Sequence, residues 1–197
     1  ELSNEECISQ FITDFGFQSF RRPLSAEEHA FFMEVYEQAP QHYPGETFDN
    51  FKRGLRDVMA VISLSPEFLY RVELGDENGN LTAYELASRL SYHFWNDMPD
   101  AELFKLATDG SLANPGVLEA QVGRMLRDPR SSALAGNFAE QWLQTRFLEG
   151  STPDPDVFPA FDPALRSAMR EETRLFFSAI IREDRSVLEF IDSDFTY

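Results

Sequence analysis

The sequence has little cysteine and no long apolar run. Cys7 is the single cysteine, so no internal disulfide can form, and no Cys-x-x-Cys-His motif for haem c attachment is present. No apolar stretch approaches the roughly 20 residues that span a bilayer. The first residues do not resemble a signal peptide. We therefore expect a soluble chain without membrane insertion, whose targeting signal, if it has one, lies elsewhere.

Basic residues are also scarce. The chain has 17 Lys and Arg against 34 Asp and Glu, a formal net charge of −17, and no basic cluster longer than Arg21-Arg22. Such a chain repels the phosphates of nucleic acids and anionic lipid head groups. We therefore expect no nucleic-acid binding, and a basic partner or a cation is the better electrostatic match.

The common catalytic and cofactor motifs are absent. There is no Gly-x-Ser-x-Gly, no Gly-x-Gly-x-x-Gly, no P-loop and no His-Glu-x-x-His. The acidic run that starts at Asp76 lacks two essential residues of a calcium loop, because Leu81 and Ala87 stand where Gly and Glu are needed. No histidine is paired with a second metal ligand at helical spacing; the three are His29, His42 and His93. We predict no catalytic, metal or cofactor site in this chain.

Aromatic residues are abundant, with 19 Phe, 6 Tyr and 2 Trp among 197 residues. This composition is too apolar for a disordered chain. Ser/Thr-x-x-Glu capping boxes predict helix starts at four places: Ser3, Ser25, Thr82 and Ser186. Apolar residues recur with a period of 3.6, and no strand-like alternation persists. We predict an all-α fold, an irregular bundle of about eight to ten helices with a proline-rich loop at residues 151–163.

A polar turn at residues 75–80 is the best candidate for a boundary within the chain. We predict two helical subdomains, residues 1–75 and 80–197, packed together as one unit. Two further residues are expected in the core. Cys7 lies beside Ile8 on the first helix, and Trp142 follows Leu134 and Phe138 at intervals of four.

The densest group of chemically capable side chains lies at the end of the helix that starts after Thr82. Tyr92, His93, Trp95 and Asp97 combine aromatic faces with hydrogen-bonding groups, as ligand sites and interface hot spots do. A hydrophobic corner of the bundle would look the same, and this second interpretation carries more weight. We name the four residues as a candidate ligand or partner surface. If Leu86, Leu90 and Phe94 form the core stripe, His93 and Trp95 flank it.

Several runs resemble known domains. Phe-Arg-Arg-Pro-Leu at 20–24 and Ser-Pro-Glu-Phe-Leu-Tyr-Arg at 65–71 resemble a domain of unknown function that accompanies cytochrome c modules in planctomycete-type exported proteins. The second half resembles the usual neighbour of that domain, on five further runs: residues 81–92, 95–100, 128–131, 138–143 and 184–187. That family more often has an apolar residue at position 93, which makes a family-wide role for His93 unexpected.

The resemblance implies context more than chemistry. It implies an extracytoplasmic, multidomain parent chain, with haem c in another domain and with the other domains of the same polypeptide as partners. Our first hypothesis is a non-catalytic scaffold or interaction module. One alternative is part of the active-site shell of a haem-dependent oxidoreductase whose cofactor lies in another domain. Another is a module that binds carbohydrate or another extracellular polymer through exposed aromatic residues.

The absence of complete ligand sets leads to a testable expectation. Haem, zinc, calcium and nucleotide sites each lack an essential residue in this sequence. The purified chain should therefore be colourless and free of metal. Elemental analysis after dialysis against a chelator checks this expectation, and stoichiometric metal that survives the dialysis would contradict it.

Overall fold

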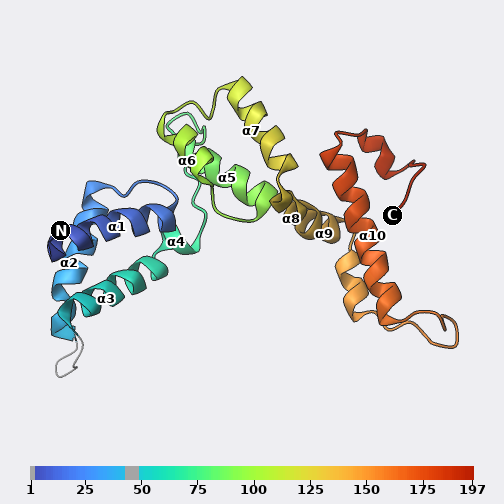
Figure 1. The fold of residues 1–197 in the computed structure, drawn as a ribbon, viewed down its shortest axis with the longest axis horizontal. Helices are drawn as coiled ribbons and strands as arrows, with labels where there is room; N and C mark the ends of the chain where they lie inside the picture. The colour runs from blue at the N-terminus through green and yellow to red at the C-terminus, as the bar shows by residue number, and fades with distance from the viewer. Residues whose placement is uncertain (1–2, 43–48) are drawn as a thin grey trace. The chain divides into compact units, whose positions relative to one another are not determined.

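The computed structural model describes residues 3–42 and 49–197 (Figure 1). These residues form ten α-helices, several short 3-10 or π segments and no strand, so the predicted all-α class is confirmed. The chain divides into two compact units, Glu1–Ser88 (unit 1) and Arg89–Tyr197 (unit 2). The proposed boundary at residues 75–80 and the packing of two subdomains as one unit stay predictions.

Unit 1 contains four helices and the start of a fifth: α1 (Asn4–Phe20), α2 (Ala26–His42), α3 (Asn50–Leu64), α4 (Pro66–Leu69) and α5 (Ala83–Trp95). The predicted capping boxes form at the starts of α1, α2 and α5. In α1, the Ser3 hydroxyl accepts the N–H of Glu6, and the Glu6 carboxylate accepts the N–H of Ser3 at 2.8 Å. The same reciprocal pair is made by Ser25 with Glu28 and by Thr82 with Glu85.

The core of unit 1 lies between α1, α2 and α3. Its fully buried members are Ile8, Ile12, Phe20, Phe32, Val58 and Ile62. The absence of a side chain at Gly54 allows α2 and α3 to pack closely, since a Cβ there would lie 2.2 Å from Cδ2 of Tyr36. The predicted apolar face of the first helix is therefore the face that is buried.

A buried arginine fixes the end of α1. Arg21 has a left-handed backbone (φ 58°) that stops the helix, and its side chain is buried. Its Nη2 donates to the carbonyl oxygens of Glu67 and Tyr70, the latter at 2.9 Å. These carbonyls lie within α4 and just after it, where helical partners are missing. Arg21 thus joins the two runs, 20–24 and 65–71, that carry the resemblance in the first half of the chain.

Unit 2 contains the end of α5 and five further α-helices: α6 (Ala101–Thr108), α7 (Pro115–Arg127), α8 (Ser132–Leu134), α9 (Glu140–Trp142) and α10 (Pro163–Arg182). Its shorter segments are η1 (Pro129–Ser131), η2 (Ala135–Ala139), η3 (Thr145–Gly150) and η4 (Val187–Phe190). Among these, η2 is a π-helix and the others are 3-10 helices. The predicted proline-rich loop lies between η3 and α10.

The prediction that Trp142 is a core residue is wrong, because its side chain is 56% exposed. Phe138 and Trp142 do share one face of the helix, since their rings stack 5.9 Å apart, but that face is the exposed one. The small residues Ala135 and Ala139 occupy the buried face and pack against Phe177 of α10. Phe138 is exposed together with Trp142.

Three smaller expectations are also corrected. Cys7 is exposed, because it falls one position outside the buried stripe that contains Ile8. Proline 40 does not stop α2, which continues to His42, since a proline this close to a helix end disrupts little of the helix. Ser186 starts a 3-10 helix without a full capping box, because the carboxylate of Glu189 binds Arg185 at 2.6 Å instead.

The contacts of Arg21 predict the effect of its removal. Arg21→Ala should lower the free energy of unfolding by about 2–3 kcal/mol, because two helix-end carbonyls lose a charged donor. Arg21→Lys should recover only part of this loss, since an ammonium lacks the planar fork of a guanidinium. Urea denaturation followed by circular dichroism measures both. Arg56→Ala, at a side chain that is 46% exposed, is the matched control and should change stability little.

Candidate functional site

The structure separates the four residues of the predicted surface. Trp95 is only 3% exposed, Tyr92 is half-buried, and His93 and Asp97 are exposed. The buried stripe of α5 consists of Ala87, Leu90, Ser91 and Trp95. The expected stripe was Leu86, Leu90 and Phe94, so Trp95 belongs to the stripe and does not flank it. A partner contact through Tyr92, His93 or Asp97 stays a prediction.

Trp95 is held from several sides within unit 2. Its indole N–H donates to the carbonyl oxygen of Met125 at 3.0 Å. The guanidinium of Arg130 lies 3.5 Å from the ring centroid, and that of Arg124 lies at 5.3 Å. Arginine stacked on a partly desolvated tryptophan face is a favourable cation–π contact. The indole therefore links the end of α5 to α7 and η1.

The two arginines over Trp95 are neutralised by two aspartates that also cap helices. Arg124 donates to both oxygens of Asp100, at 2.7 and 3.2 Å, and Asp100 caps α6 by accepting the N–H of Leu103. Arg130 donates to both oxygens of Asp128, at 3.0 and 2.9 Å, and Asp128 caps η1. We call Trp95, Asp100, Arg124, Asp128 and Arg130 the tryptophan–arginine cluster.

The electrostatics of this cluster favour ionised carboxylates. The hydrogen bond from Arg130 and the backbone N–H of that residue lower the pKa of Asp128 from 3.8 to about 2. Burial raises the pKa of Asp100, but the hydrogen bonds from Arg124 and Leu103 outweigh it, and the net shift is downward. Such carboxylates remain charged at neutral pH and cannot serve there as proton donors. The cluster is a structural anchor, and it joins the runs 95–100 and 128–131 noted in the sequence.

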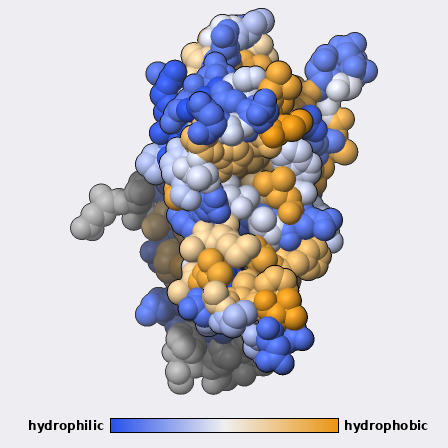
Figure 2. All heavy atoms as spheres, turned by 90° about the vertical axis from the view of Figure 1, so that its right-hand side faces the viewer, coloured by the Kyte–Doolittle hydropathy of each residue, from blue (hydrophilic) through white to orange (hydrophobic). Residues whose placement is uncertain are grey.

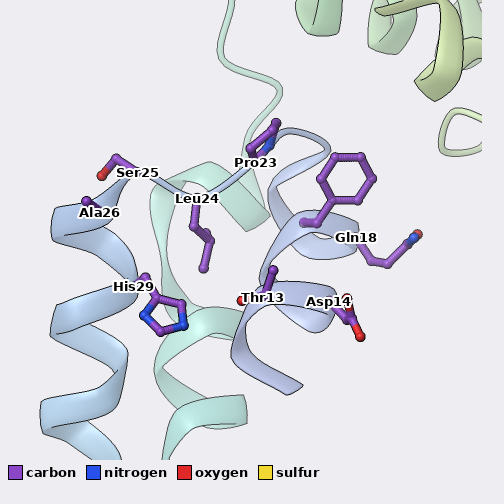
Figure 3. Close-up of a pocket in the computed structure, with 9 residues that line it drawn as sticks. Thr13, Asp14, Gln18, Pro23, Leu24, Ser25, Ala26 and His29 are labelled. Atoms are coloured by element: carbon purple, nitrogen blue, oxygen red, sulfur yellow. The ribbon is translucent and has the colours of Figure 1, made fainter. Parts of the chain in front are cut away.

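A hollow of about 590 Å³ lies on unit 1, between α1 and the start of α2 (Figure 3). Phe17, Pro23 and Leu24 provide its apolar wall. Six further residues line it: Thr13, Asp14, Gln18, Ser25, Ala26 and His29. Figure 3 shows Leu24 and the His29 ring between the two helices. Leu24 approaches α1 closely because Gly16 has no side chain, and a Cβ there would lie 2.5 Å from Cδ1 of Leu24.

His29 is the histidine of this hollow, and its Nε2 lies 3.2 Å from the hydroxyl of Ser9. The structure places the half-buried ring partly in the interface between α1 and α2. His42 lies in unit 1 with its Nδ1 3.5 Å from a carboxylate oxygen of Asp57, whereas His93 contacts the ring of Phe94. In residues 3–42 and 49–197, no three His, Cys, Asp or Glu side chains gather as metal ligands do.

Several large apolar side chains are exposed in the C-terminal part of unit 2. We define the aromatic face by six residues: Phe138, Trp142, Val187, Leu188, Phe190 and Ile191. Ring contacts connect its three aromatic members, since Trp142 lies 5.9 Å from both Phe138 and Phe190 between centroids, and the three aliphatic members flank Phe190 in the sequence. Leu188 is 69% and Ile191 is 89% exposed. In Figure 2, which looks onto the side of Figure 1 where α10 lies, apolar residues form patches between polar ones.

The aromatic face rests on a deeper layer from α10. Phe177 is buried and lies 5.2 Å from Phe190, and Phe176 contacts both Phe190 and Phe195. Phe138 lies 6.1 Å from Phe177, and Trp142 lies 5.9 Å from Phe190, between ring centroids. Arg146 donates from Nη2 to the carbonyl oxygens of Gly136 and Asn137 within η2, at 3.4 and 3.3 Å. The face is therefore supported from below, and the π-helix is tied to the chain that follows it.

Sequence reasoning missed this face for a physical reason. The intervals between Leu134, Phe138 and Trp142 indicate a buried helical stripe, but the buried stripe lies one position further along, at Ala135 and Ala139. A usable signal was the run Val187, Leu188, Phe190 and Ile191, which is too apolar for one turn of helix with a single buried side.

Comparisons with known families place both halves of the chain. Residues 81–197 match the model of PSD4, described as a protein of unknown function (DUF1592), and this match covers more than half of the chain. The chain belongs to the DUF1592 family. Residues 7–73 match PSD5, a protein of unknown function (DUF1595). The expectation of two adjacent domains of unknown function is confirmed. No curated protein and no solved structure matches the chain.

The DUF1592 match contains both the tryptophan–arginine cluster and the aromatic face, whereas the hollow on unit 1 lies within the DUF1595 match. Among the helices of the described residues, none combines the length and apolar character that crossing a membrane requires. The descriptions of both families state no activity. The proposed function therefore rests on the surfaces of this chain.

The lowered pKa of Asp128 predicts a pH dependence of stability. A carboxylate with a folded-state pKa near 2 stabilises the fold fully above its ordinary pKa of 3.8 and loses that contribution as the pH falls toward 2. Asp128→Asn should reduce the loss of stability between pH 5 and pH 2.5 by about 1 kcal/mol or less, because the pair is partly exposed.

Urea denaturation at four pH values across this range provides the measurement. Asp156→Asn is the control, because the Asp156 carboxylate forms no hydrogen bond or ion pair with the described residues. Identical pH profiles for Asp128→Asn and the wild type would show that Arg130 does not hold the Asp128 carboxylate in solution.

Proposed function

We propose that this chain is a non-catalytic helical scaffold and interaction module, and that the aromatic face of unit 2 is its contact surface. The observation that carries the proposal is the exposure of five apolar side chains, Phe138, Trp142, Val187, Leu188 and Ile191, together with the half-buried Phe190, whose ring contacts Trp142 and Phe177. A half-exposed large side chain leaves on the order of 100 Å² accessible, so the face approaches the upper end of the roughly 300–600 Å² found for the largest apolar patch on a monomer.

The construction of the face supports the proposal. Exposure of Ile191 and Leu188 to water adds nothing to the stability of the chain alone. A partner that covers them buries apolar surface, and this burial favours binding. Trp142 and Phe138 are residue types that dominate binding energy at interfaces. Phe138 lies in the π-helix η2, a distortion that is frequent at functional sites. The tryptophan–arginine cluster stabilises the rest of the same unit and leaves this face free for a partner.

The parent polypeptide is proposed to be an exported, multidomain protein that carries haem c in another domain. The support for this part is the resemblance of the sequence runs to domains that accompany cytochrome c modules. The partner of the aromatic face is then another domain of the same polypeptide. If the chain is instead part of an active-site shell, its aromatic face makes the same contact, and this contact also affects the haem of the neighbouring domain.

Binding of an extracellular polymer is a second candidate, favoured by one observation. Trp142 is 56% exposed, and an exposed indole can stack on a sugar ring. Against it, Phe138 already stacks on Trp142 at an interplanar angle of 26°, so less of the indole is available as a platform. We therefore rank it below the protein–protein contact.

Site-specific crosslinking tests the proposed contact. A photoreactive benzoylphenylalanine is placed at position 191 in the full parent polypeptide, and at position 74 as a control, because Leu74 is also highly exposed but lies in unit 1. We expect crosslinks from position 191 to converge on one defined segment when mapped by mass spectrometry. Scattered crosslinks of equal yield from positions 191 and 74 would refute the proposal.

Two further measurements separate the alternatives. Trp142→Ala should leave migration in polysaccharide-containing gels unchanged, and a loss of retardation in this variant would favour polymer binding. A shift in the reduction potential of haem c in the parent polypeptide, caused by the same substitution, would favour the active-site shell.

A further inference from the structure

The aromatic face has acidic neighbours that indicate the chemistry of its partner. Residues 183–194, which contain four of its six members, carry five carboxylates and one arginine. Asp192 directly follows Ile191, the most exposed apolar residue of the face. Asp192, Asp194 and Asp184 are exposed. The apolar surface and the uncompensated negative charge therefore occur on the same short segment.

The one arginine of this segment is already paired with carboxylates of the same segment. Arg185 donates from Nε to Glu189 at 2.6 Å and from Nη1 to Glu183 at 3.0 Å, and its guanidinium lies 4.2 Å from the centroid of Phe195. The carboxylates of Glu183 and Glu189 are therefore paired. Asp184, Asp192 and Asp194 form no ion pair with the described residues, and their charges are available to a partner.

We propose that the aromatic face binds a basic amphipathic α-helix, in which apolar side chains form one stripe and Lys or Arg residues border it. This inference rests on the proposed function and names the chemistry of the partner. The apolar stripe would cover Trp142, Leu188 and Ile191, while the basic border would pair with Asp192 and Asp194. Long basic side chains suit this arrangement, because their methylene stems cover apolar surface while their charged ends reach carboxylates.

Charge complementarity favours this partner over other occupants of the face. A second copy of the chain carries the same net charge of −17 and would bring like charges together. An anionic lipid surface would be repelled for the same reason. A basic helix removes the apolar surface from water and neutralises the unpaired aspartates in one contact. Helices of this kind bind grooves and faces through residues spaced three or four apart.

Three synthetic peptides test the proposal on the 197-residue chain. The first is a Leu/Lys amphipathic helix, the second has the same Leu positions with Glu, and the third has the same Lys positions with Ser. Fluorescence anisotropy gives the Kd of each at low salt. We expect the Leu/Lys peptide to bind about tenfold or more tightly than either of the others, and we expect this preference to shrink at high salt.

Variants locate the binding. Ile191→Ser should weaken the Leu/Lys peptide about tenfold, whereas Leu74→Ser, an equally exposed site on unit 1, should have no effect. The double variant Asp192→Asn, Asp194→Asn should weaken binding of the Leu/Lys peptide about threefold or more, and it should strengthen or leave unchanged binding of the Leu/Glu peptide, because like charges are removed. Both changes affect exposed side chains, so the thermal melting curves should match that of the wild type.

The outcomes distinguish this inference from the proposed function. Equal binding of the Leu/Lys and Leu/Glu peptides, lost in Ile191→Ser, would overturn the basic partner and support the interaction face. Binding of the Leu/Lys peptide that survives Ile191→Ser would reflect a general attraction to an acidic protein and would overturn the inference. Absence of binding by all three peptides would also overturn it, while the crosslinks from position 191 judge the proposed function separately.

Discussion

Each unit depends on arginine side chains that satisfy the polar groups at helix ends. In unit 1, Arg21 donates to carbonyls at the end of α4, and in unit 2, Arg130 and Arg124 bind the capping aspartates Asp128 and Asp100. Short helices expose many unpaired backbone groups for the area they bury, so their ends must be satisfied by side chains. The chain has twice as many acidic as basic residues, and these arginines are already bound to helix-end groups. The surplus negative charge therefore remains on the surface.

The functional proposal depends on this division between paired arginines and unpaired carboxylates. The tryptophan–arginine cluster places Trp95 in the interior, where its N–H and both arginines have partners. The aromatic face has the opposite character, because its side chains are connected to one another but not covered. A partner with apolar and basic side chains would cover this apolar surface and neutralise the aspartates beside it. The hollow on unit 1, lined by His29 and Leu24, lies within the DUF1595 match and has no part in the proposed contact.

Sequence reasoning succeeded where the physics is local and failed where it depends on packing. The capping boxes at Ser3, Ser25 and Thr82 were predictable, because each involves groups three residues apart. Ser186 was not, because Glu189 is drawn to Arg185. Trp142 was misplaced because the neighbouring stripe of Ala135 and Ala139, and not the stripe of Phe138 and Trp142, is the buried one against Phe177 of α10. Trp95 was expected to flank the core stripe of its helix, but it is buried, and only the structure showed that Arg130 covers its ring.

The sequence by itself determined the all-α class, the helix starts, the acidic character and the lack of a complete catalytic motif, because these follow from periodicity, spacing and composition. The tertiary structure decided which aromatic residues are buried and which are presented to solvent. That choice depends on how α10 packs on Ala135 and Ala139, and on whether an arginine lies within reach of a ring. Such contacts join residues far apart in the chain, and no local pattern specifies them.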